Sequence, residues 1–324
     1  MPDPDLTWRS LEPADVPDYA ELLAAAEAVD QTGEHYAEAD LQQQMQDDSL
    51  DLALDTWAVL DGSGLVAAGA VLGAVEVWDV HTVHCFGVVH PGHRGRGIGR
   101  ELLGRQLDRA AQLHAARHPR HPARLAVGVF DHNTPAAALM RSAGLSRERH
   151  FFDMELDLRA GDAPRRDLPA PLRIVGFGWD RDDEVRRAHN VAFRDHYGST
   201  ERDPASWKQW FTGSRNFRAE DSYLVLAGPE PDAPVAAYLL TYFYDADQAA
   251  TGKRQAHIGQ LGTLPLYRGR GAGTALLAHA LLAFRDAGYD LSGLDVDSAN
   301  GSGALGLYQR LGFAVTHSVT SWER

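Results

Sequence analysis

The sequence predicts an α/β fold of the α+β type that occurs twice along the chain. Residues 87–103 and 261–277 share one order of features: a short apolar run, a proline, an Arg-x-x-Gly-x-Gly loop and an amphipathic run. Paired apolar runs precede each loop, and another apolar run follows each amphipathic run. Paired runs predict antiparallel hairpins, and a run reached through a helix predicts a neighbouring strand. We therefore expect two domains, each with a mixed, mostly antiparallel sheet flanked by helices.

The length and one unusual segment predict where the domains divide. The chain has 324 residues, which suits two domains of about 150 residues better than one. Residues 159–171 read RAGDAPRRDLPAP, a proline-rich, charged stretch without apolar periodicity that is typical of a linker. We therefore expect an N-terminal domain over residues 1–158, a linker over 159–171 and a C-terminal domain over 172–324.

Charge and cysteine content exclude several classes of function. The net charge of −14 and the pI of about 5.5 argue against a nucleic-acid partner held on a basic surface. No apolar run approaches the length of a membrane-spanning helix, so no membrane partner is expected. Cys85 is the only cysteine, which excludes an intrachain disulfide. With no leader-like segment at Met1, these features predict a cytoplasmic protein.

Apolar periodicity and turn residues predict the remaining elements of each domain. In the first half they predict helices over residues 19–29 and 36–46, a hairpin formed by 55–60 and 65–77, and strands over 81–89 and 125–130. In the second half they predict a strand over 172–175, helices over 184–193 and 202–211, a hairpin formed by 223–227 and 235–244, and strands over 256–264 and 293–296.

The repeated loop is suited to bind a phosphate group. Gly97 and Gly271 let the backbone turn tightly, and the helix that follows adds about half a positive charge at its N-terminus. Arg94 and Arg268 offer charge-assisted donors. One such turn often has only a conformational role, but two near-copies favour a ligand. The spacing matches neither the Walker lysine loop nor the dinucleotide fingerprint.

The loop resembles that of the GNAT superfamily of N-acetyltransferases, in which an Arg/Gln-x-x-Gly-x-Gly/Ala loop cradles the pyrophosphate of acetyl-CoA. GNAT domains also close with a strand, an asparagine at a helix start, and a tyrosine four residues before the glycine of a Gly-Phe pair. The second half has Asn300, Tyr308 and the pair at Gly312. The first half has Asn133, but Met140 stands at the position of the tyrosine.

The resemblance implies a sheet that splays where acetyl-CoA enters, with both loops holding this co-substrate. The implied contacts are Leu261, Gly262, Thr263, Arg268, Gly269, Arg270, Gly271, Ala272, Gly273, Thr274 and Asn300 in the second half, and Gly87, Val88, Val89, Arg94, Gly95, Arg96, Gly97, Ile98, Gly99, Arg100 and Asn133 in the first.

Acetyl transfer to an amine needs a base for the amine, a donor for the thioester oxygen and a proton for the departing thiolate. The resemblance implies a base on the strand before the loop, often a glutamate, and a tyrosine as the acid. His257 and Tyr308 stand at these positions, and an imidazole can accept a proton at neutral pH. Counting back from the loop prolines, Val83 corresponds to His257; counting back from the closing glycines, Met140 corresponds to Tyr308. We therefore expect a catalytic C-terminal domain and an inactive N-terminal one.

Each of these residues also has a purely structural interpretation. His257 can be a strand histidine that points at solvent, and Tyr308 can be a core aromatic at helical spacing. Asn133 and Asn300 can cap their helices. Cys85 is interpreted as a small buried hydrophobe.

A cluster of histidines follows the first amphipathic run, at His114, His118 and His121. Clustered histidines can bind a metal ion, but Pro119 interrupts any common helical face and no carboxylate or cysteine joins them. We interpret the segment as a solvated loop and expect no metal site.

Two tandem GNAT domains with catalytic residues in the second resemble the mycothiol synthases of actinobacteria, which acetylate a cysteinyl amine and carry a glutamate where His257 stands. The expected acceptor is a primary amine of a small molecule. Asp295 and His196 are candidate acceptor contacts by position. The alternatives are a mycothiol synthase itself, or a non-catalytic module that binds acetyl-CoA. A monomer or a homodimer is expected.

Overall fold

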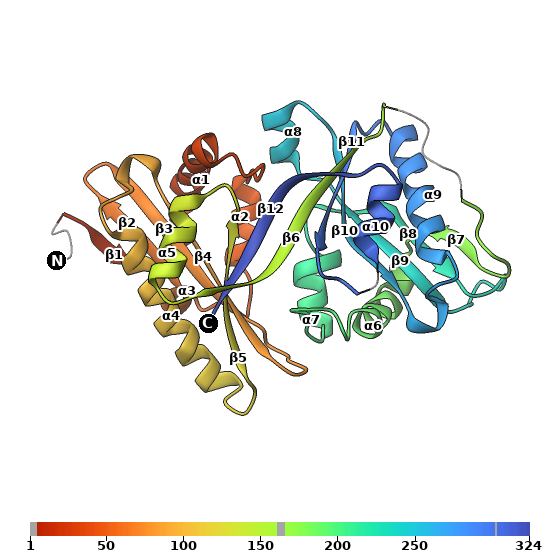
Figure 1. Ribbon diagram of the computed structural model, residues 1–324, viewed down its shortest axis with the longest axis horizontal. Helices are drawn as coiled ribbons and strands as arrows, with labels where there is room; N and C mark the ends of the chain where they lie inside the picture. Colours follow the sequence, from red (N-terminus) through yellow and green to blue (C-terminus); the bar gives the residue numbers. More distant parts are fainter. Residues whose placement is uncertain (1–4, 161–165, 302) are drawn as a thin grey trace. The chain divides into compact units, whose positions relative to one another are not determined.

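The computed structural model describes residues 5–160, 166–301 and 303–324. It divides into two compact units: Met1–His150 with Ser318–Arg324 form unit 1, and Phe151–His317 form unit 2. Each unit contains one copy of the repeated loop and a sheet with helices on both faces (Figure 1). Part of the predicted linker, residues 161–165, lies outside the described residues.

Unit 1 has the strand order β1-β2-β3-β4-β5-β12. Strands β1 to β4 pair antiparallel, β4 and β5 pair parallel, and β5 and β12 pair antiparallel. The strands that belong wholly to this unit are β1 (Thr7–Arg9), β2 (Thr56–Asp61), β3 (Gly64–Gly73), β4 (His81–Val89) and β5 (Ala123–Phe130). Its helices are α1 (Val16–Asp30), α2 (Glu38–Met45), α3 (Leu52–Asp55), α4 (Ile98–Arg117) and α5 (Thr134–Ser142), with 3-10 turns at Pro13–Asp15 and Pro91–His93.

Unit 2 has the strand order β6-β11-β10-β9-β8-β7. Here β10 and β11 are parallel, and the other neighbours are antiparallel. The strands that belong wholly to this unit are β7 (Arg173–Gly176), β8 (Phe217–Leu226), β9 (Val235–Tyr242), β10 (Gln255–Thr263) and β11 (Leu291–Asp297). Its helices are α6 (Asp182–Ala192), α7 (Pro204–Trp207), α8 (Asp245–Thr251), α9 (Ala272–Asp286) and α10 (Ala304–Arg310), with 3-10 turns at Trp179–Arg181 and Pro265–Tyr267.

The predicted fold class is confirmed in both units, because each has a mixed, mostly antiparallel sheet flanked by helices. The clearest differences are local and lie in unit 2. The helix predicted over residues 202–211 is a short α-helix, α7, that continues as a π-helix over Lys208–Thr212. Helix α8 has the polar sequence DADQAAT, which carries no apolar stripe that could predict it.

The last strand of each half of the sequence completes the sheet of the other unit. Strand β6 (Ser146–Asp157) pairs antiparallel along the whole of β11, with Phe151 opposite Asp297. Strand β12 (Ala314–Glu323) pairs antiparallel with β5, with Val319 opposite Phe130. The division expected from the sequence, at residues 158 and 172, differs from the observed units by these two exchanged strands.

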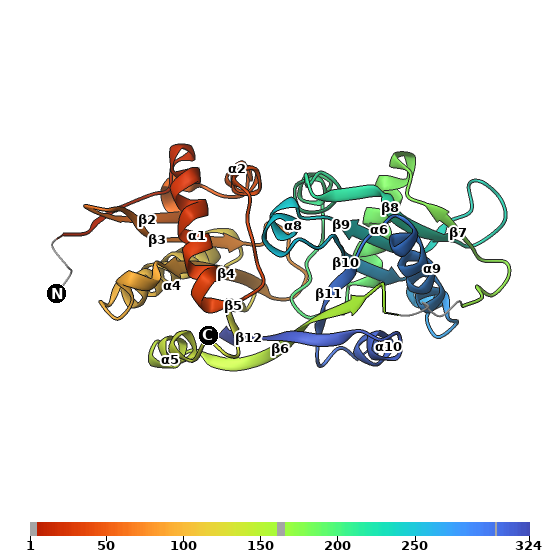
Figure 2. The same cartoon turned by 90° about the horizontal axis from the view of Figure 1, so that it is seen from above.

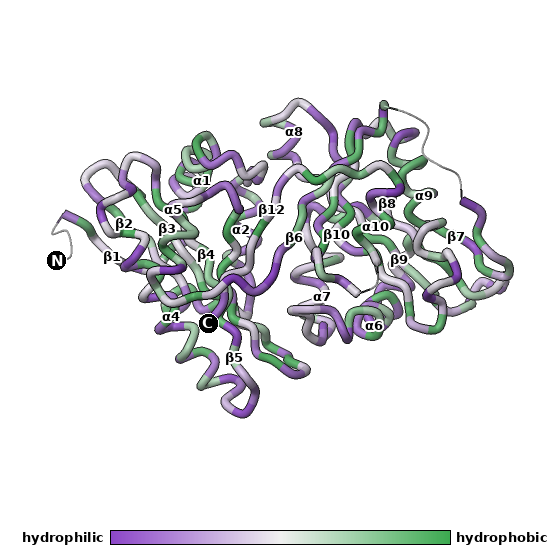
Figure 3. The backbone as a smooth tube through the Cα atoms, in the orientation of Figure 1, coloured by the Kyte–Doolittle hydropathy of each residue, from purple (hydrophilic) through white to green (hydrophobic). Residues whose placement is uncertain are grey.

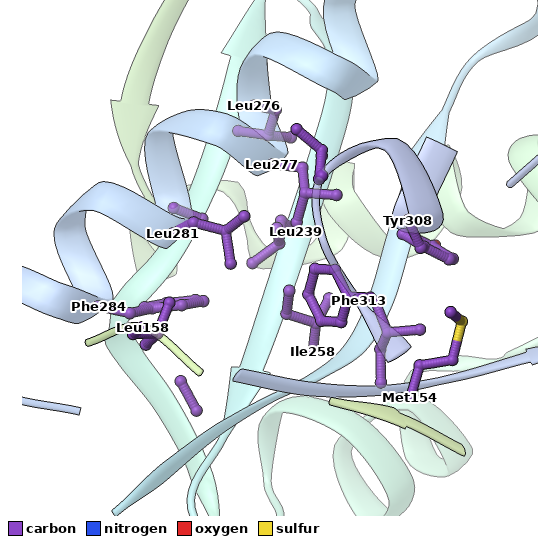
Figure 4. Close-up of a cluster of buried hydrophobic side chains, with 14 of the residues drawn as sticks. Met154, Leu158, Leu239, Ile258, Leu276, Leu277, Leu281, Phe284, Tyr308 and Phe313 are labelled. Atoms are coloured by element: carbon purple, nitrogen blue, oxygen red, sulfur yellow. The ribbon is translucent and has the colours of Figure 1, made fainter. Parts of the chain in front are cut away.

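The exchanged β6 contributes to the core of unit 2. Met154 of this strand, and Leu158 directly after it, pack in one cluster with Leu277 and Phe284 of α9 and Ile258 of β10 (Figure 4). Burying such a side chain stabilises a fold by about 1.5–3 kcal/mol. Unit 2 therefore depends on residues from the first half of the sequence.

Strand β12 likewise contributes to the core of unit 1. Trp322 is 4% exposed and belongs to the core cluster of Leu103, Leu107 and Met140. The backbone of Arg324 exchanges two hydrogen bonds with Leu125 on β5, of 3.0 and 3.1 Å. The end of the chain is therefore an integral part of the unit that contains its beginning.

The two faces of the unit 2 sheet carry different helices (Figures 1 and 2). Helix α9 covers one face, where its leucines meet Leu239 of β9 and Ile258 of β10. Helices α6 and α7 cover the other face, where Tyr238 and Leu240 of β9 pack with Trp207. Figure 3 colours β9 and α9 as mostly hydrophobic, as expected for elements buried between layers.

One buried histidine stands in the core between α6 and β9. His189 of α6 is 3% exposed, its Nδ1 lies 2.8 Å from the Tyr238 hydroxyl, and its ring stacks on Phe193. Burial lowers the pKa of His189 to about 3, with Arg202 and His196 adding to the effect. The imidazole is therefore neutral in the folded protein.

A second buried histidine begins β4. His81 is fully buried, and its Nδ1 lies 3.0 Å from Nδ1 of His114. The ring of His118 meets it edge-on, with 4.6 Å between centroids. Burial and these two neighbours lower the pKa of His81 to about 4. The predicted solvated loop is therefore wrong: His114 lies within α4, and all three histidines are half-buried, with Nδ1 of His121 fully buried.

Removing the indole of Trp322 should destabilise the protein although the residue is third from the end. Trp322→Ala should lower the free energy of unfolding by about 3–5 kcal/mol, the usual cost of emptying a buried aromatic site. Urea unfolding followed by circular dichroism measures this change. The control is Trp210→Ala, at a site 40% exposed, which should cost less than about 1 kcal/mol. Equal effects of the two variants would contradict the strand exchange.

The neutral state of His189 should make stability fall in acid. Its folded pKa of about 3 lies below the ordinary value of 6.5, so the unfolded chain binds more protons between these pH values. Below pH 6.5, the contribution of His189 to the free energy of unfolding should therefore decrease by about 1.4 kcal/mol per pH unit. The double variant His189→Phe with Tyr238→Phe should lose that slope in urea titrations, whereas His132→Gln, at an exposed site, should keep it. An unchanged slope in the double variant would refute the assignment.

Candidate active site

Strands β10 and β11 part before β10 ends. They pair in parallel over residues 255–258 of β10 only. Strand β10 then runs on to Thr263, still paired with β9, while β11 has left its other side. The backbone of β10 beyond Ile258 therefore has no strand partner on that side. In unit 1, β4 and β5 part in the same way after His84.

A β-bulge at Gly259 lies where the two strands part. The register with β9 passes from Ile258 to Gln260, so Gly259 is skipped by both ladders. A Cβ atom on Gly259 would lie 2.5 Å from the ring of Tyr242, which requires glycine here. A bulge turns backbone groups out of the ladder, where they can meet a ligand. Pairing of β4 with β3 in unit 1 has no such interruption.

The bulge changes which residues correspond across the duplication. His257 pairs with Tyr242 and faces the α6 side of the sheet, as Tyr242 does. Val83, its expected counterpart, packs in the core beneath α4. Because the bulge adds one residue to β10, His84 takes the place of His257 in unit 1. The predicted correspondence with Val83 is therefore wrong, and unit 1 also has an imidazole at this position.

Each repeated loop enters its helix through two glycines with left-handed backbone. Gly269 and Gly271 have φ angles of 72° and 81°, and a Cβ on either would meet no atom within 4 Å. Gly271 is the N-cap of α9, and no side chain caps this helix. Gly95 and Gly97 precede α4 in the same way. Each helix thus starts with N–H groups beside open space, which suits a phosphate.

The first arginine of each loop fastens the loop to the unit. Arg268 donates from Nε to the Thr263 carbonyl at 3.1 Å and from Nη2 to the Ala192 carbonyl at the end of α6 at 2.7 Å. Arg94 makes the equivalent strand contact at 3.0 Å and pairs through both Nη atoms with Asp30 at the end of α1, at 2.7 Å each. These guanidinium groups position the loop, whereas the sequence suggested that they face the ligand.

The other predicted loop residues fall into three environments. Gly262 lies beneath the ring of Tyr238, where any Cβ would collide. Buried or half-buried residues are Leu261, Thr263, Ala272, Gly273, Thr274, Val88, Val89, Ile98 and Gly99. Exposed residues are Gly87, Arg96, Arg100 and Arg270.

The two predicted asparagines differ in their contacts. Asn133 caps α5, because its Oδ1 accepts the Ala136 N–H at 3.1 Å. Helix α10 instead has Gly303 as its N-cap, and the Asn300 N–H donates to the Asp297 carbonyl at 3.0 Å. The interpretation as a helix cap therefore holds for Asn133 but not for Asn300.

Tyr308 stands on α10 at the margin of the unit 2 core (Figure 4). The residue is 8% exposed and its ring lies 5.9 Å from that of Phe313, yet the hydroxyl has no hydrogen-bond partner among the described residues. Burial raises the pKa of Tyr308 to about 12, so the phenol keeps its proton. Met140 fills the corresponding place in the core of unit 1.

His257 and Asp295 meet on the face of the strand pair that α6 covers. Nε2 of His257 lies 3.7 Å from Oδ2 of Asp295, and its ring meets Tyr244 edge-on at 5.8 Å. The Asp295 side chain is 62% exposed and that of His257 is 21% exposed. Two residues that the sequence suggested for separate roles, base and acceptor contact, therefore form one pair.

The predicted catalytic residues lie on opposite faces of β10. Ile258, the neighbour of His257, belongs to the same cluster as Tyr308, and side chains alternate across a strand. His257 and Tyr308 therefore do not touch. A group held where β10 and β11 part can be reached by one residue from each face.

Sequence reasoning overlooked the residues around the end of α6. His189 and Tyr238 form a buried pair behind Gly262. His196, a predicted acceptor contact, has its ring 5.1 Å from Phe193, which stacks on His189. The dense aromatic content of residues 189–211 was the available signal, but only the fold brings these residues to β9.

These features fit a ligand with a pyrophosphate group and an extended arm. The uncapped start of α9 can bind the phosphates, and the unpaired edge of β10 can accept backbone-like hydrogen bonds from the arm. Among the described residues, no three histidine, cysteine or carboxylate side chains are arranged to hold a metal ion. No described helix is long and apolar enough to cross a lipid bilayer.

Known proteins resemble this chain along most of its length. Residues 5–146 match a model described as acetyltransferase (GNAT) domain, and residues 183–313 match one described as acetyltransferase (GNAT) family. A mycothiol acetyltransferase of Frankia alni is 31% identical, covering 96% of this chain and 92% of its own length.

Solved structures agree with this similarity. A GCN5-related N-acetyltransferase from Sphaerobacter thermophilus superposes with a TM-score of 0.76 at 22% identity, covering 100% of this chain and 96% of that one. A tandem GNAT protein from the clavulanic acid biosynthesis pathway superposes with a TM-score of 0.70 at 20% identity, covering 98% of each chain. These likenesses support the fold, while the sequence matches identify the family. The chain belongs to the GNAT acetyltransferase family as a tandem member and is an acyltransferase.

Proposed function

We propose that this chain transfers an acetyl group from acetyl-CoA to a primary amine of a small molecule, and that unit 2 performs the transfer. The main observation behind this proposal is that three features lie around the point where β10 and β11 part. These are the bulge at Gly259, the pair of His257 with Asp295, and the unpartnered hydroxyl of Tyr308. GNAT acetyltransferases use acetyl-CoA, which supplies the acetyl group as a thioester.

Backbone groups supply the binding and the electrostatic stabilisation. The N–H groups from Gly271 into the first turn of α9 bind the pyrophosphate, where the helix dipole favours negative charge. The backbone exposed by the bulge at Gly259 donates to the thioester oxygen, on which negative charge develops during attack.

Side chains on the two faces of β10 move the protons. His257 accepts a proton from the attacking amine, and Asp295 at 3.7 Å stabilises the imidazolium that forms. Tyr308 donates its proton to the departing sulfur, because its raised pKa keeps the phenol neutral. The proton gained at His257 and the proton lost at Tyr308 balance when both groups re-equilibrate with solvent.

Unit 1 keeps the loop but lacks part of this arrangement. Gly97 and an uncapped α4 suit a phosphate, and His84 stands where His257 does. Met140 cannot donate a proton, and β4 has no bulge to turn its backbone outward. We therefore propose that unit 1 binds acetyl-CoA without transferring its acetyl group.

The relatives suggest a second candidate for the acceptor. Several curated relatives are named mycothiol acetyltransferase, including one that matches 96% of this chain. Acetylation of a cysteinyl amine is therefore one alternative to the proposed reaction. The second alternative is a module that binds acetyl-CoA without turnover. Loss of the acetyl-CoA thioester, measured across a panel of amines that includes cysteinyl amines, separates the three.

Binding stoichiometry tests the roles of the two loops. Gly271→Val places a β-branched side chain in the space beside the helix N-terminus and forces it into a left-handed backbone, so the unit 2 site should close. Calorimetry should give two acetyl-CoA sites in the wild type and one in this variant. Gly97→Val should remove the other site. A single wild-type site that survives Gly97→Val would show that unit 1 does not bind.

Loss of one hydroxyl tests the catalytic assignment. Tyr308→Phe keeps the packed ring, so kcat should fall by about 10²–10⁴-fold while acetyl-CoA affinity stays within about twofold. His257→Gln should lower kcat most strongly for the most basic amines, which are almost fully protonated at neutral pH and therefore depend most on a base. The matched control Met140→Leu should change neither constant. Full turnover by Tyr308→Phe would remove this residue from the mechanism.

A further inference from the structure

One arginine in unit 2 has a buried N–H group without a hydrogen-bond partner among the described residues. Arg202 precedes α7, and its guanidinium makes no hydrogen bond and no ion pair with any described residue. Its Nε is completely buried and has no partner. Native proteins pair nearly all buried polar atoms, so the unpartnered Nε of this half-buried arginine needs an explanation.

Two nearby carboxylates make their hydrogen bonds to groups other than the Arg202 guanidinium. Asp203 follows Arg202 in the chain, but its carboxylate caps α7 by accepting the Ser206 N–H at 2.7 Å. On α6, Asp183 pairs with Arg186 and Arg187. The guanidinium of Arg202 instead lies 5.3 Å above the ring of Phe211. That contact covers the face of the guanidinium and supplies no acceptor for its N–H groups.

The backbone of Arg202 is held firmly by α6. Asn190 clamps it from both sides, accepting the Arg202 N–H at 2.9 Å and donating to its carbonyl at 3.0 Å. Arg186 donates to the same carbonyl at 2.8 Å. Three hydrogen bonds to one residue in a connecting segment fix the start of its side chain, as expected of a preorganised binding residue.

Arg202 also lies on the acceptor side of the sheet. It packs on Phe211, which belongs to the cluster of Tyr238 and Tyr242, on the face that His257 shares. Arg202 and His196 are both close enough to His189 to help keep that imidazole neutral. This side of unit 2 therefore presents cationic and neutral nitrogen groups in a protein whose net charge is −14. A negatively charged ligand needs such a local attraction to approach an acidic protein.

We propose that Arg202 binds an anionic group, a carboxylate or a phosphate, on the amine that accepts the acetyl group. The proposal rests on the function proposed above and narrows its substrate class to amines that carry a negative charge. A guanidinium suits this role because it makes two parallel hydrogen bonds to either group. The amine is then held with its charged end at Arg202 and its nitrogen toward His257.

Matched pairs of acceptors test the proposal in the full-length chain. The pairs are an amino acid with its amide, for the carboxylate, and O-phosphoethanolamine with ethanolamine, for the phosphate. In at least one pair the wild type should show a kcat/KM at least tenfold higher for the anionic member. Arg202→Gln should abolish that preference through KM, Arg202→Lys should keep part of it, and Arg187→Gln, on the surface of α6, should keep all of it. A wild type without preference in either pair would overturn the proposal.

Two further measurements separate the sources of the anion and guard against misfolding. If Arg202 binds a phosphate of the co-substrate instead, Arg202→Gln raises KM for acetyl-CoA and leaves the acceptor preference intact, which contradicts the proposal. Calorimetry with acetate and with inorganic phosphate should detect an anion site in the wild type that Arg202→Gln loses.

An unpaired cation is not needed for folding, so the Tm of Arg202→Gln should equal or exceed that of the wild type. A lower Tm would indicate that Arg202 has a structural role, which would contradict the proposal. Absence of turnover on every amine would contradict the proposed function, while the anion titration would still decide about Arg202.

Discussion

The early end of the hydrogen-bond ladder between β10 and β11 is the constraint on which the candidate site depends. Because pairing stops at Ile258, the rest of β10 keeps β9 on one side and has an unpaired edge on the other. The same strand then leads into the loop and the start of α9, so the uncapped start of this helix and the unpaired edge are continuous. His257 and Tyr308 lie on opposite faces of this strand, because it stands between their two layers.

The fold and the loops were predictable because their signals are local. A glycine in left-handed backbone before a helix, as at Gly271, is dictated by a few neighbouring residues, and apolar periodicity gives most strands. The exchange of β6 and β12 has no such signal. Either strand offers an apolar face to either unit, and the choice depends on contacts such as those of Met154 and Trp322 with residues far away in the sequence.

Within the site, each difference between the predicted and the observed residue positions has one physical cause. The bulge at Gly259 shifts side-chain alternation by one residue, so counting from the loop assigned Val83 to the place that His84 holds. Arg268 has the charge to bind a phosphate, but a nearby carbonyl on α6 engages it first. Arg202 gave no signal at all in the sequence, since an unpaired charge is recognised only when its surroundings are known.

The two units also differ in how they pack beside the strand that leads into the loop. In unit 1, Gly69 and Gly87 face each other across β3 and β4, and Gln106 of α4 fills the space above them, donating to the Ala70 carbonyl at 3.2 Å. In unit 2 two leucines, Leu239 and Leu261, face each other instead, beneath an alanine-rich turn of α9. Each arrangement fills its volume, so neither strand can adopt the other's register without leaving a cavity or a clash. On the proposed mechanism, a tyrosine placed at Met140 alone would not give transfer in unit 1, because β4 lacks the bulge that Gly259 forms in β10.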